Sequence, residues 1–333
     1  MEESKYVLGM DLGASGTKAQ RIKLNDNKIE IDEYKLSNKV KMVEPDLDLS
    51  EKKSDNSADE AQLDFEVKTE SLSGEGFYTV KDHNGKEIDV LNTRYLVGEA
   101  AASAYGDKVD DIGGNTYKTS QYAFYGNFLG NLLLFAMKER KKELTVKLGL
   151  TLPPREVKDT ETMNKVKSFL SGNQYFFTLP NRDNEEFIIT VESEEEDGIK
   201  IEREGYISLY NFLFDIEEDK IRLKEENKWL KEEDLMLFYL GDTTLELLNV
   251  IKLNTQKSTL DTFEMGAKEV RSELFNAIKN TPRFNAATLK LNDHILQEAL
   301  VTGEVPILGK VTKEIVPEIN RARAEIARQI FES

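Results

Sequence analysis

The sequence predicts a two-lobed α/β protein, and three observations favour this fold class. The chain has 333 residues, which is enough for two domains that each bury a core. Segments with strand-like and helix-like apolar spacing alternate along it. A strand, a glycine-bearing turn and a second strand occur once in each half. We therefore expect lobe I over residues 1–155 and lobe II over residues 156–333.

The first strand ends in a motif with chemical meaning. An apolar run over residues 6–8 leads to an acid, a tight turn follows, and a second strand covers residues 19–24. Such a turn can aim several backbone N–H groups at one point, and phosphate oxygens suit that nest. Glycine permits close approach, a lysine adds positive charge, and an acid can hold Mg²⁺ through water. The motif therefore predicts a nucleotide phosphate site formed by Asp11, Gly13, Ala14, Ser15, Gly16 and Lys18.

The remainder of the first half predicts mostly strands. Residues 5–24 form a hairpin and residues 28–43 one further strand. Residues 44–74 are rich in acids and serine, which favours a mobile acidic surface insertion, or alternatively a docking loop for a basic partner. The remaining predicted elements are a hairpin at 77–91, a helix at 119–140 and a strand at 144–150.

The second half repeats this alternation. Its predicted elements are a helix at 161–170, strands at 174–179 and 186–191, a short strand and helix within 199–214, strands at 235–240 and 245–253, and helices at 266–279, 292–300 and 308–331. The charged residues 215–234 are expected to form a solvated helix or loop. Pro317 should kink the last helix, because proline cannot donate a backbone hydrogen bond.

Composition excludes several classes of function. A net charge of −17 repels nucleic acid and anionic lipid, and it favours a basic protein partner. With no cysteine and only two histidines, thiolate catalysis and histidine-rich metal sites are not expected. No apolar stretch approaches the ~20 residues of a membrane span, and the N-terminus lacks the apolar core of a signal peptide. These features predict a cytoplasmic protein.

Four segments carry a resemblance to a known family, namely residues 11–18, residues 95–101 followed by 115–118, residues 149–153, and residues 240–246. In this order and spacing the chain resembles the actin-like ATPases, and among them the bacterial plasmid-segregation actins of the ParM type. The resemblance implies two related lobes of ribonuclease H-like topology, with ATP or GTP and Mg²⁺ in the cleft between them. It also implies head-to-tail filaments whose ends bind a basic, DNA-bound adaptor protein.

The resemblance also implies roles for individual residues. Glu204 aligns with the carboxylate that orients the attacking water, which phosphoryl transfer requires. Asp11 and Asp242 are the expected acids for Mg²⁺, held through water. The second phosphate turn comprises Gly241, Asp242, Thr243 and Thr244, and the nucleoside is assigned to Gly266, Asn320 and Arg321.

Two positions depart from the family pattern. The second phosphate turn begins with Tyr239 where the family has Asp, and a tyrosine cannot replace a carboxylate near Mg²⁺. Asp242 is the expected substitute, and hydrolysis is expected to be slowed if it is a poor one. Family members also continue beyond the last helix into a strand, an adenosine-binding loop and a closing helix. This sequence stops at Ser333, so the fold is expected to lack that segment.

Three functions remain open at this point. The leading hypothesis is a filament-forming nucleotide switch that drives plasmid segregation. The first alternative is a structural filament protein that binds nucleotide but hydrolyses it poorly, because of Tyr239. The second is a relative of the sugar kinases and chaperones that shares the phosphate hairpins but does not polymerise.

Overall fold

The computed structural model describes most of the chain and divides it into two compact units. The described residues are 5–13, 16–25, 28–37, 39–43, 62–70, 78–81, 87–98, 100–101, 117–217, 220–241, 244–255, 261–263, 265–281, 291–307 and 311–332. Unit 1 comprises Met1–Leu237 and Leu247–Asp261, and unit 2 comprises Phe238–Glu246 and Thr262–Ser333. The expected lobe boundary near residue 155 stays a prediction.

In the described part of unit 1, ten strands form one mixed sheet in the order β3-β2-β1-β9-β11-β10-β5-β8-β4, with β12 pairing to β9. Small hairpins, short helices and 3-10 turns accompany this sheet. The strands of the sheet are β1 (Lys5–Gly13), β2 (Gly16–Asn25), β3 (Lys28–Leu36), β4 (Val40–Val43), β5 (Gln62–Glu70), β8 (Thr93–Gly98), β9 (Glu143–Leu152), β10 (Gln174–Leu179), β11 (Glu185–Val191) and β12 (Ile199–Arg203). The other elements are β6 (Thr79–Lys81), β7 (Glu87–Asp89), η1 (Lys118–Ser120), α2 (Tyr122–Glu139), α3 (Pro154–Lys158), α4 (Thr160–Leu170), η2 (Glu194–Glu196), α5 (Tyr206–Leu213), β13 (Phe214–Glu217), β14 (Lys220–Leu223) and η3 (Glu225–Lys231).

Strand β9 organises the sheet, because it pairs in parallel with three strands. One edge of β9 pairs with β1 over residues 146–151. The other edge pairs first with β11 and then, nearer its carboxyl end, with β12. The carboxyl ends of β1, β9 and β12 therefore lie at one edge of the sheet, which is where parallel α/β sheets bind ligands.

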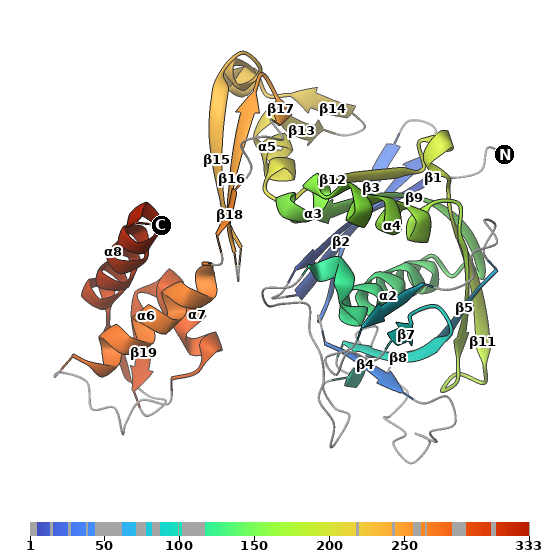
Figure 1. Cartoon of the computed structure of the whole chain (residues 1–333), viewed down its shortest axis with the longest axis horizontal. Coiled ribbons are helices and arrows are strands. Elements are labelled where there is room, and N and C mark those ends of the chain that lie inside the picture. Colours follow the sequence, from blue (N-terminus) through green and yellow to red (C-terminus); the bar gives the residue numbers. More distant parts are fainter. Residues whose placement is uncertain are drawn as a thin grey trace. The chain divides into compact units, whose positions relative to one another are not determined.

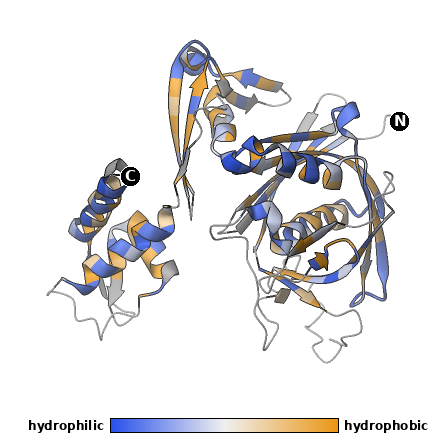
Figure 2. Cartoon of the chain, in the orientation of Figure 1, coloured by the Kyte–Doolittle hydropathy of each residue, from blue (hydrophilic) through white to orange (hydrophobic). Residues whose placement is uncertain are grey.

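The core of unit 1 lies around α2. Every residue of this helix from Tyr122 to Ala136 is buried, so it is covered on all sides rather than along one stripe. Figure 1 shows the sheet curving around α2, and Figure 2 shows the hydrophobic colouring of that helix. Aromatic rings fill the space between α2 and its neighbours, with Tyr125 and Phe169 centred 4.7 Å apart. The predicted helix at 119–140 is thereby confirmed, preceded by the short turn η1.

The expectation of an acidic surface insertion at 44–74 is wrong for residues 62–70. These residues form β5, which pairs with β10 on one side and β8 on the other. Its alternate residues Leu63, Phe65 and Val67 are buried in the core. The many acids of the segment hid this period-two pattern, which is the mark of a strand with one buried face. Residues 44–61 and 71–74 of the insertion lie outside the described residues.

Two further element predictions in unit 1 need correction. The single strand predicted at 28–43 is two strands, because β3 pairs with β2 whereas β4 pairs with β8. The charged stretch predicted as a helix or loop forms the β13–β14 hairpin and the 3-10 helix η3. Charged residues alternate with apolar ones along that hairpin, so high overall charge was a poor guide to its secondary structure.

Unit 2 contains the second strand–turn–strand segment and a small helical core. Strands β15 (Asp234–Leu240), β16 (Leu245–Ile251), β17 (Asn254–Thr255) and β18 (Asp261–Phe263) form a sheet that contributes to both units. The helical core packs Leu274, Leu296, Val305 and Ile319 together. The remaining elements of unit 2 are α6 (Ala267–Lys279), α7 (Asp293–Thr302), β19 (Glu304–Ile307), β20 (Val311–Glu314) and α8 (Val316–Glu332).

The helix predicted at 308–331 is shorter than expected. Residues 304–307 and 311–314 form the antiparallel pair β19–β20, and α8 begins only at Val316. Pro317 is therefore the second residue of the helix, where a missing N–H breaks no helical bond, and the predicted kink is wrong. None of the described helices is long and apolar enough to cross a membrane.

Candidate functional site

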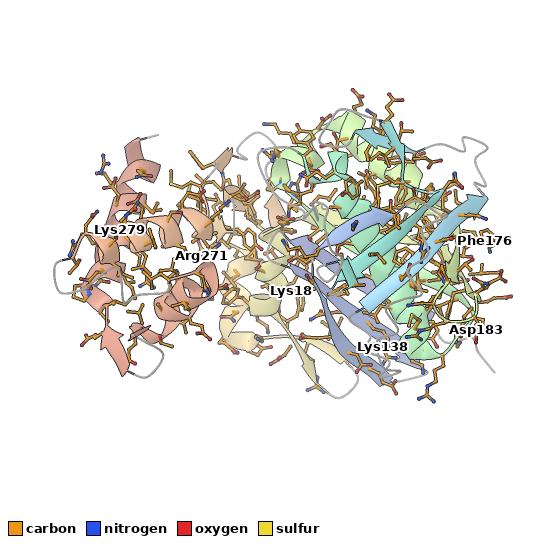
Figure 3. The ribbon with its side chains drawn as sticks, turned by 90° about the horizontal axis from the view of Figure 1, so that it is seen from below. Lys18, Lys138, Phe176, Asp183, Arg271 and Lys279 are labelled. Carbon is orange, nitrogen blue, oxygen red and sulfur yellow. The ribbon has the colours of Figure 1, made fainter. Side chains whose placement is uncertain are left out.

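The first predicted phosphate turn closes the β1–β2 hairpin of unit 1. Gly13 and Gly16 are paired across the hairpin, and Asp11 lies opposite Lys18. Residues opposite each other on antiparallel strands share one face, so this acid and this lysine lie side by side at the turn. Lys18 is exposed and can be followed in Figure 3. The tip residues Ala14 and Ser15 lie outside the described residues.

Asp11 also faces the neighbouring strand. Its Cα partner on β9 is Thr151, whose hydroxyl donates to Asp11 Oδ1 at 3.2 Å. Asp11 is half-buried at the sheet edge, in register with Lys18 on β2 and with Thr151 on β9. An acid held in this way fits the expected role of a water-mediated Mg²⁺ ligand.

Glu204 lies at the end of β12, and it is buried. Its backbone N–H donates to the carbonyl of Leu152 at 2.9 Å, which ties it to the end of β9. Gly205 follows with a φ of +77°, a left-handed conformation that suits glycine and turns the chain into α5. The Lys118 ammonium donates to Glu204 Oε1 at 2.6 Å, so the carboxylate meets a cation inside the unit.

Glu156 fixes the segment that carries Lys118. This acid has no exposed surface, and it accepts three hydrogen bonds from η1. The backbone N–H of Lys118 donates at 2.7 Å, and the backbone N–H and hydroxyl of Thr119 donate at 3.1 and 2.7 Å. A carboxylate that accepts backbone N–H groups at the start of a helical turn is a strong cap, because the bonds are charge-assisted.

The electrostatics of this cluster raise the pKa of both Glu204 and Lys118. Burial is the largest influence on Glu204 and raises its pKa to about 7, although Lys118 opposes the shift; Asp11 and Glu156 add to it. Burial alone would lower the pKa of Lys118, but the negative charges of Glu204 and Asp11 outweigh it, so that pKa is raised. Perturbed titratable groups gathered at a sheet edge are a common mark of a functional site.

We name this cluster of Asp11, Lys118, Glu156 and Glu204 the acidic cluster. The sequence pointed to Asp11 and Glu204 but assigned no role to the other two. Lys118 is the last residue of one family-like segment and Glu156 follows another, but neither residue stood out within its segment. Among the residues that the structure describes, no three His, Cys, Asp or Glu side chains are grouped as direct ligands of a metal ion.

The second predicted phosphate turn lies in unit 2. The backbone N–H of Gly241 donates to the carbonyl of Thr244 at 2.7 Å, which closes the turn between β15 and β16. The Gly241 carbonyl in turn accepts from the backbone N–H of Ala267 at 2.9 Å, so the turn is tied to the start of α6. This bond places Gly266, an expected nucleoside residue, beside the second turn. Asp242 and Thr243 lie outside the described residues.

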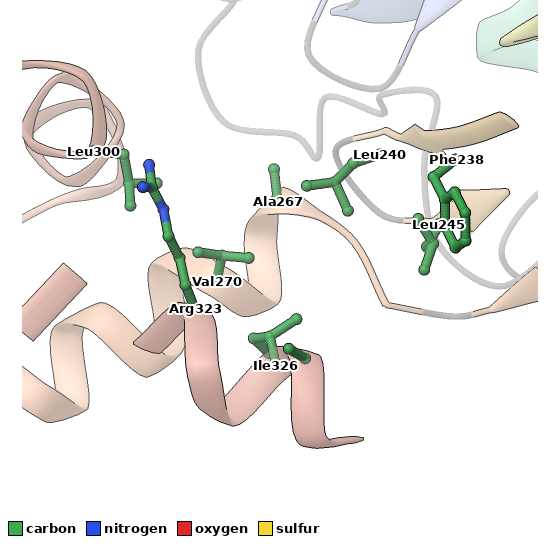
Figure 4. A pocket seen from close by; sticks show the side chains of 9 residues that line it. Phe238, Leu240, Leu245, Ala267, Val270, Leu300, Arg323 and Ile326 are labelled. Atoms are coloured by element: carbon green, nitrogen blue, oxygen red, sulfur yellow. The ribbon is translucent and has the colours of Figure 1, made fainter. Parts of the chain in front are cut away.

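An apolar pocket of about 480 Å³ adjoins this turn within unit 2. Its walls come from β15 and β16, which flank the turn, and from α6, α7 and α8 (Figure 4). The lining residues are Phe238, Leu240, Leu245, Ala267, Val270, Leu300, Arg323, Ile326 and Ala327. Arg323 is the single charged member of this lining, and its side chain runs from α8 toward Leu300.

The other two expected nucleoside residues are exposed on α8 and do not line the pocket. Asn320 lies one helical turn before Arg323 and so shares its face, whereas Arg321 is two residues away and points to a different side. Their nucleoside role stays a prediction.

Comparison with known proteins gives a clear result for structure alone. No protein-family model matches the chain, and no curated protein is significantly similar to it in sequence. The solved structure of Bacillus thuringiensis ParM with ATP matches with a TM-score of 0.62 and 13% identity, over 99% of this chain and 83% of that one. The archaeal actin homolog Ta0583 matches with a TM-score of 0.59 and 14% identity, over 98% and 81%. The actin-like protein Alp7A matches with a TM-score of 0.59 and 14% identity, over 96% and 76%.

The chain therefore has an actin-like α/β fold, as its sequence predicted. More narrowly, the proteins whose fold it shares include the ParM proteins of Bacillus thuringiensis and of pSK41, the latter at a TM-score of 0.59 and 12% identity.

Proposed function

We propose that the chain is a filament-forming, actin-like nucleotide-binding protein that hydrolyses a Mg-bound purine triphosphate. The proposed phosphate-binding residues are Asp11, Gly13, Ala14, Ser15, Gly16 and Lys18 of the first turn, and Gly241, Asp242, Thr243 and Thr244 of the second. ParM of Bacillus thuringiensis has been solved with ATP and with ADP, which supports a nucleotide for this fold.

The observation that carries the proposal is the burial of Glu204 beside Lys118 at the ends of three parallel strands. Burying a charged pair is costly and adds little to stability by itself. Its place at the ligand-binding edge of the sheet, near Asp11, favours a chemical role over a purely structural one. A carboxylate there can orient a water molecule for attack on the terminal phosphate.

The residues also fit a magnesium ion. Asp11 is half-buried and held by Thr151, and the acidic cluster carries three carboxylates against one ammonium, so added positive charge is favourable there. When bound, Mg²⁺ neutralises negative charge on the phosphate that is released and on the phosphates that stay on the nucleotide. Asp242 is the proposed second acid, and Asn320, Arg321 and Gly266 are the proposed nucleoside residues.

The wider role is proposed from the same fold. In this proposal, nucleotide binding closes the lobes and favours head-to-tail assembly into filaments, and hydrolysis weakens the filament. The cycle requires only that the assembled and unassembled states differ in nucleotide affinity. We propose that such filaments act in the cytoplasm and move plasmid DNA through a basic, DNA-bound adaptor. The net charge of −17 supports a basic partner rather than direct contact with DNA or membrane.

Titration calorimetry with Mg-ATP and Mg-GTP, paired with sedimentation and phosphate release, tests the proposal. We expect uptake of at least one of the two nucleotides, pelleting that depends on it, and phosphate release that follows pelleting. Absence of binding to either nucleotide would overturn the proposal. Binding without pelleting at high protein concentration would instead favour a non-polymerising relative of the sugar kinases.

A second candidate function is favoured by Tyr239. This residue of β15 stands two positions before Gly241, where the resemblance implies an acid. If Asp242 does not replace that acid, the chain would assemble with nucleotide and release little phosphate. Pelleting with ATP and no phosphate release would favour this structural filament protein, and Tyr239→Asp should then raise the release rate.

A further inference from the structure

Three segments of unit 1 meet at one lysine. Glu156, just after the Pro153-Pro154 pair, accepts the backbone N–H groups of residues 118 and 119. Lys118 then reaches from that fixed backbone to Glu204 at the start of α5. Glu156 therefore fixes the position of Lys118, and Lys118 in turn fixes the position of the Glu204 carboxylate.

Glu156 and Glu204 are buried, and Lys118 between them is only slightly exposed. The side chains of Lys118 and Glu204 are 15% and 8% exposed, and Glu156 has no exposed surface. In such surroundings a lone carboxylate would be neutral or would turn toward solvent, because burial penalises its charge. A charged donor at hydrogen-bond distance opposes this penalty and holds the carboxylate in one orientation.

We infer that Lys118 is a positioning residue for phosphate release, which acts by holding Oε1 of Glu204 so that the carboxylate keeps one orientation toward the attacking water. The inference rests on the proposed function, and it adds a residue for which the sequence suggested no role. Lys118 acts through Glu204 rather than on the nucleotide itself, so its loss changes the rate of hydrolysis and leaves nucleotide affinity nearly intact.

The test compares five variants of the full chain: Lys118→Met, Lys118→Arg, Glu204→Gln, the double variant Lys118→Met/Glu204→Gln, and Lys165→Met. The last is the matched control, because Lys165 also pairs with a glutamate at 2.7 Å but on the exposed face of α4. Each variant is measured for thermal unfolding, for affinity toward a fluorescent ATP analogue with Mg²⁺, and for single-turnover phosphate release.

We expect Lys118→Met to slow phosphate release by ~10²-fold or more, with nucleotide affinity within about threefold of the unaltered chain. Lys118→Arg should recover at least about tenfold of that loss, because it restores a charged donor. The double variant should be no slower than Glu204→Gln, since residues that act as a unit are not additive. Lys165→Met should match the unaltered chain in every measurement.

Three outcomes would overturn the inference. Losses that multiply in the double variant would mean that Lys118 acts independently of Glu204. A large fall in affinity with unchanged phosphate release would mean that Lys118 contacts the phosphates. A rate for Lys118→Arg as low as for Lys118→Met would exclude a role for the charge. If Lys118→Met unfolds, Lys118→Gln takes its place in the series.

A titration of the nucleotide-free chain separates this inference from the proposed function. Carbon-13 NMR of the glutamate carboxyls, with Glu204 assigned by its loss in Glu204→Gln, follows that group against pH. The Glu204 midpoint should rise by about one pH unit or more in Lys118→Met. An unmoved midpoint sinks the inference, even if nucleotide binds. If the midpoint rises but the chain binds no nucleotide, the ion pair is supported and the proposed function is rejected.

Discussion

Arg94 and Asp64 form a two-point ion pair between the adjacent strands β8 and β5. Nε and one terminal nitrogen of the guanidinium each donate to a separate carboxylate oxygen at 2.8 Å. Both side chains are less than a tenth exposed, so the pair sits within the sheet rather than on its rim. It fixes the register of β5 against β8 from the side chains as well as from the backbone.

The first prediction concerns this pair. Arg94→Met should lower the free energy of unfolding by about 3–5 kcal/mol, because it leaves the Asp64 carboxylate buried without its cation. Urea denaturation followed by circular dichroism measures the change. The double variant Asp64→Leu/Arg94→Met should recover part of the loss, and Lys142→Met, which breaks an exposed pair with Glu185, is the matched surface control. A double variant that is less stable than Arg94→Met would contradict this account.

Strand β5 shows where sequence reasoning fails. Segments with long, consistent periodicity, such as α2, were predictable because their apolar spacing is unbroken over many residues. Strand β5 was missed because Asp64 and Glu66 dominate its composition, whereas its pairing partners come from residues 93–98 and 174–178. Local charge carries no information about a distant arginine that neutralises it.

The second prediction concerns close packing against α2. A Cβ at Gly126 would lie 2.6 Å from Val40 Cγ1 and 3.0 Å from the Tyr95 ring. Gly126→Ala should therefore destabilise the chain, since overpacking costs about 1–3 kcal/mol and outweighs the helix propensity gained, about 1 kcal/mol. Thermal unfolding measures the net effect. Ser168→Ala on the exposed face of α4 is the control and should be neutral or slightly stabilising.

The third prediction concerns Glu204 as the group that orients water. Glu204→Gln keeps the size of the side chain and removes its charge, so phosphate release should fall by ~10²–10⁴-fold. Nucleotide affinity should change little, because the phosphates are assigned to the two turns. Single-turnover phosphate release and calorimetry measure the two quantities separately. Equal losses in both would show that Glu204 helps to bind nucleotide rather than to activate water.

The fourth prediction follows from the pKa of Glu204, which burial raises to about 7 from the ordinary 4.5. Because the folded chain favours the protonated acid, its contribution to stability is complete below about pH 4.5 and is lost as pH rises through about 7. The stability of the unaltered chain relative to Glu204→Gln should fall over this window, by on the order of 3 kcal/mol. Urea denaturation at several pH values checks the sign, and a difference that is flat with pH would refute it.

Hydrolysis should have the opposite pH dependence. A carboxylate that orients water must be ionised, so phosphate release by the unaltered chain should rise as pH passes through about 7. The Glu204→Gln variant should show no such rise.

The candidate site was predictable to a similar degree as the fold. Asp11 and the glycines of the first turn stand in one short stretch, which sequence can reveal. The partners of Glu204 cannot be found in this way, because Lys118 lies 86 residues before it in the chain. They meet only through the parallel pairing of β9 with β1 and β12, and nothing in the local sequence encodes that arrangement.

The position of β9 has a consequence for synthesis of the chain. Strand β1 leaves the ribosome early and can pair with β2 at once. Its other neighbour comes much later, because Thr151 of β9, which lies beside Asp11, follows 140 residues after it. At ~5–20 residues per second, this interval lasts roughly 7–28 s. During that time the edge of β1 that pairs with β9 in the folded chain has unpaired backbone N–H and C=O groups. Chaperones that cover unpaired strand edges are therefore expected to raise the share of newly made chain that reaches its native state.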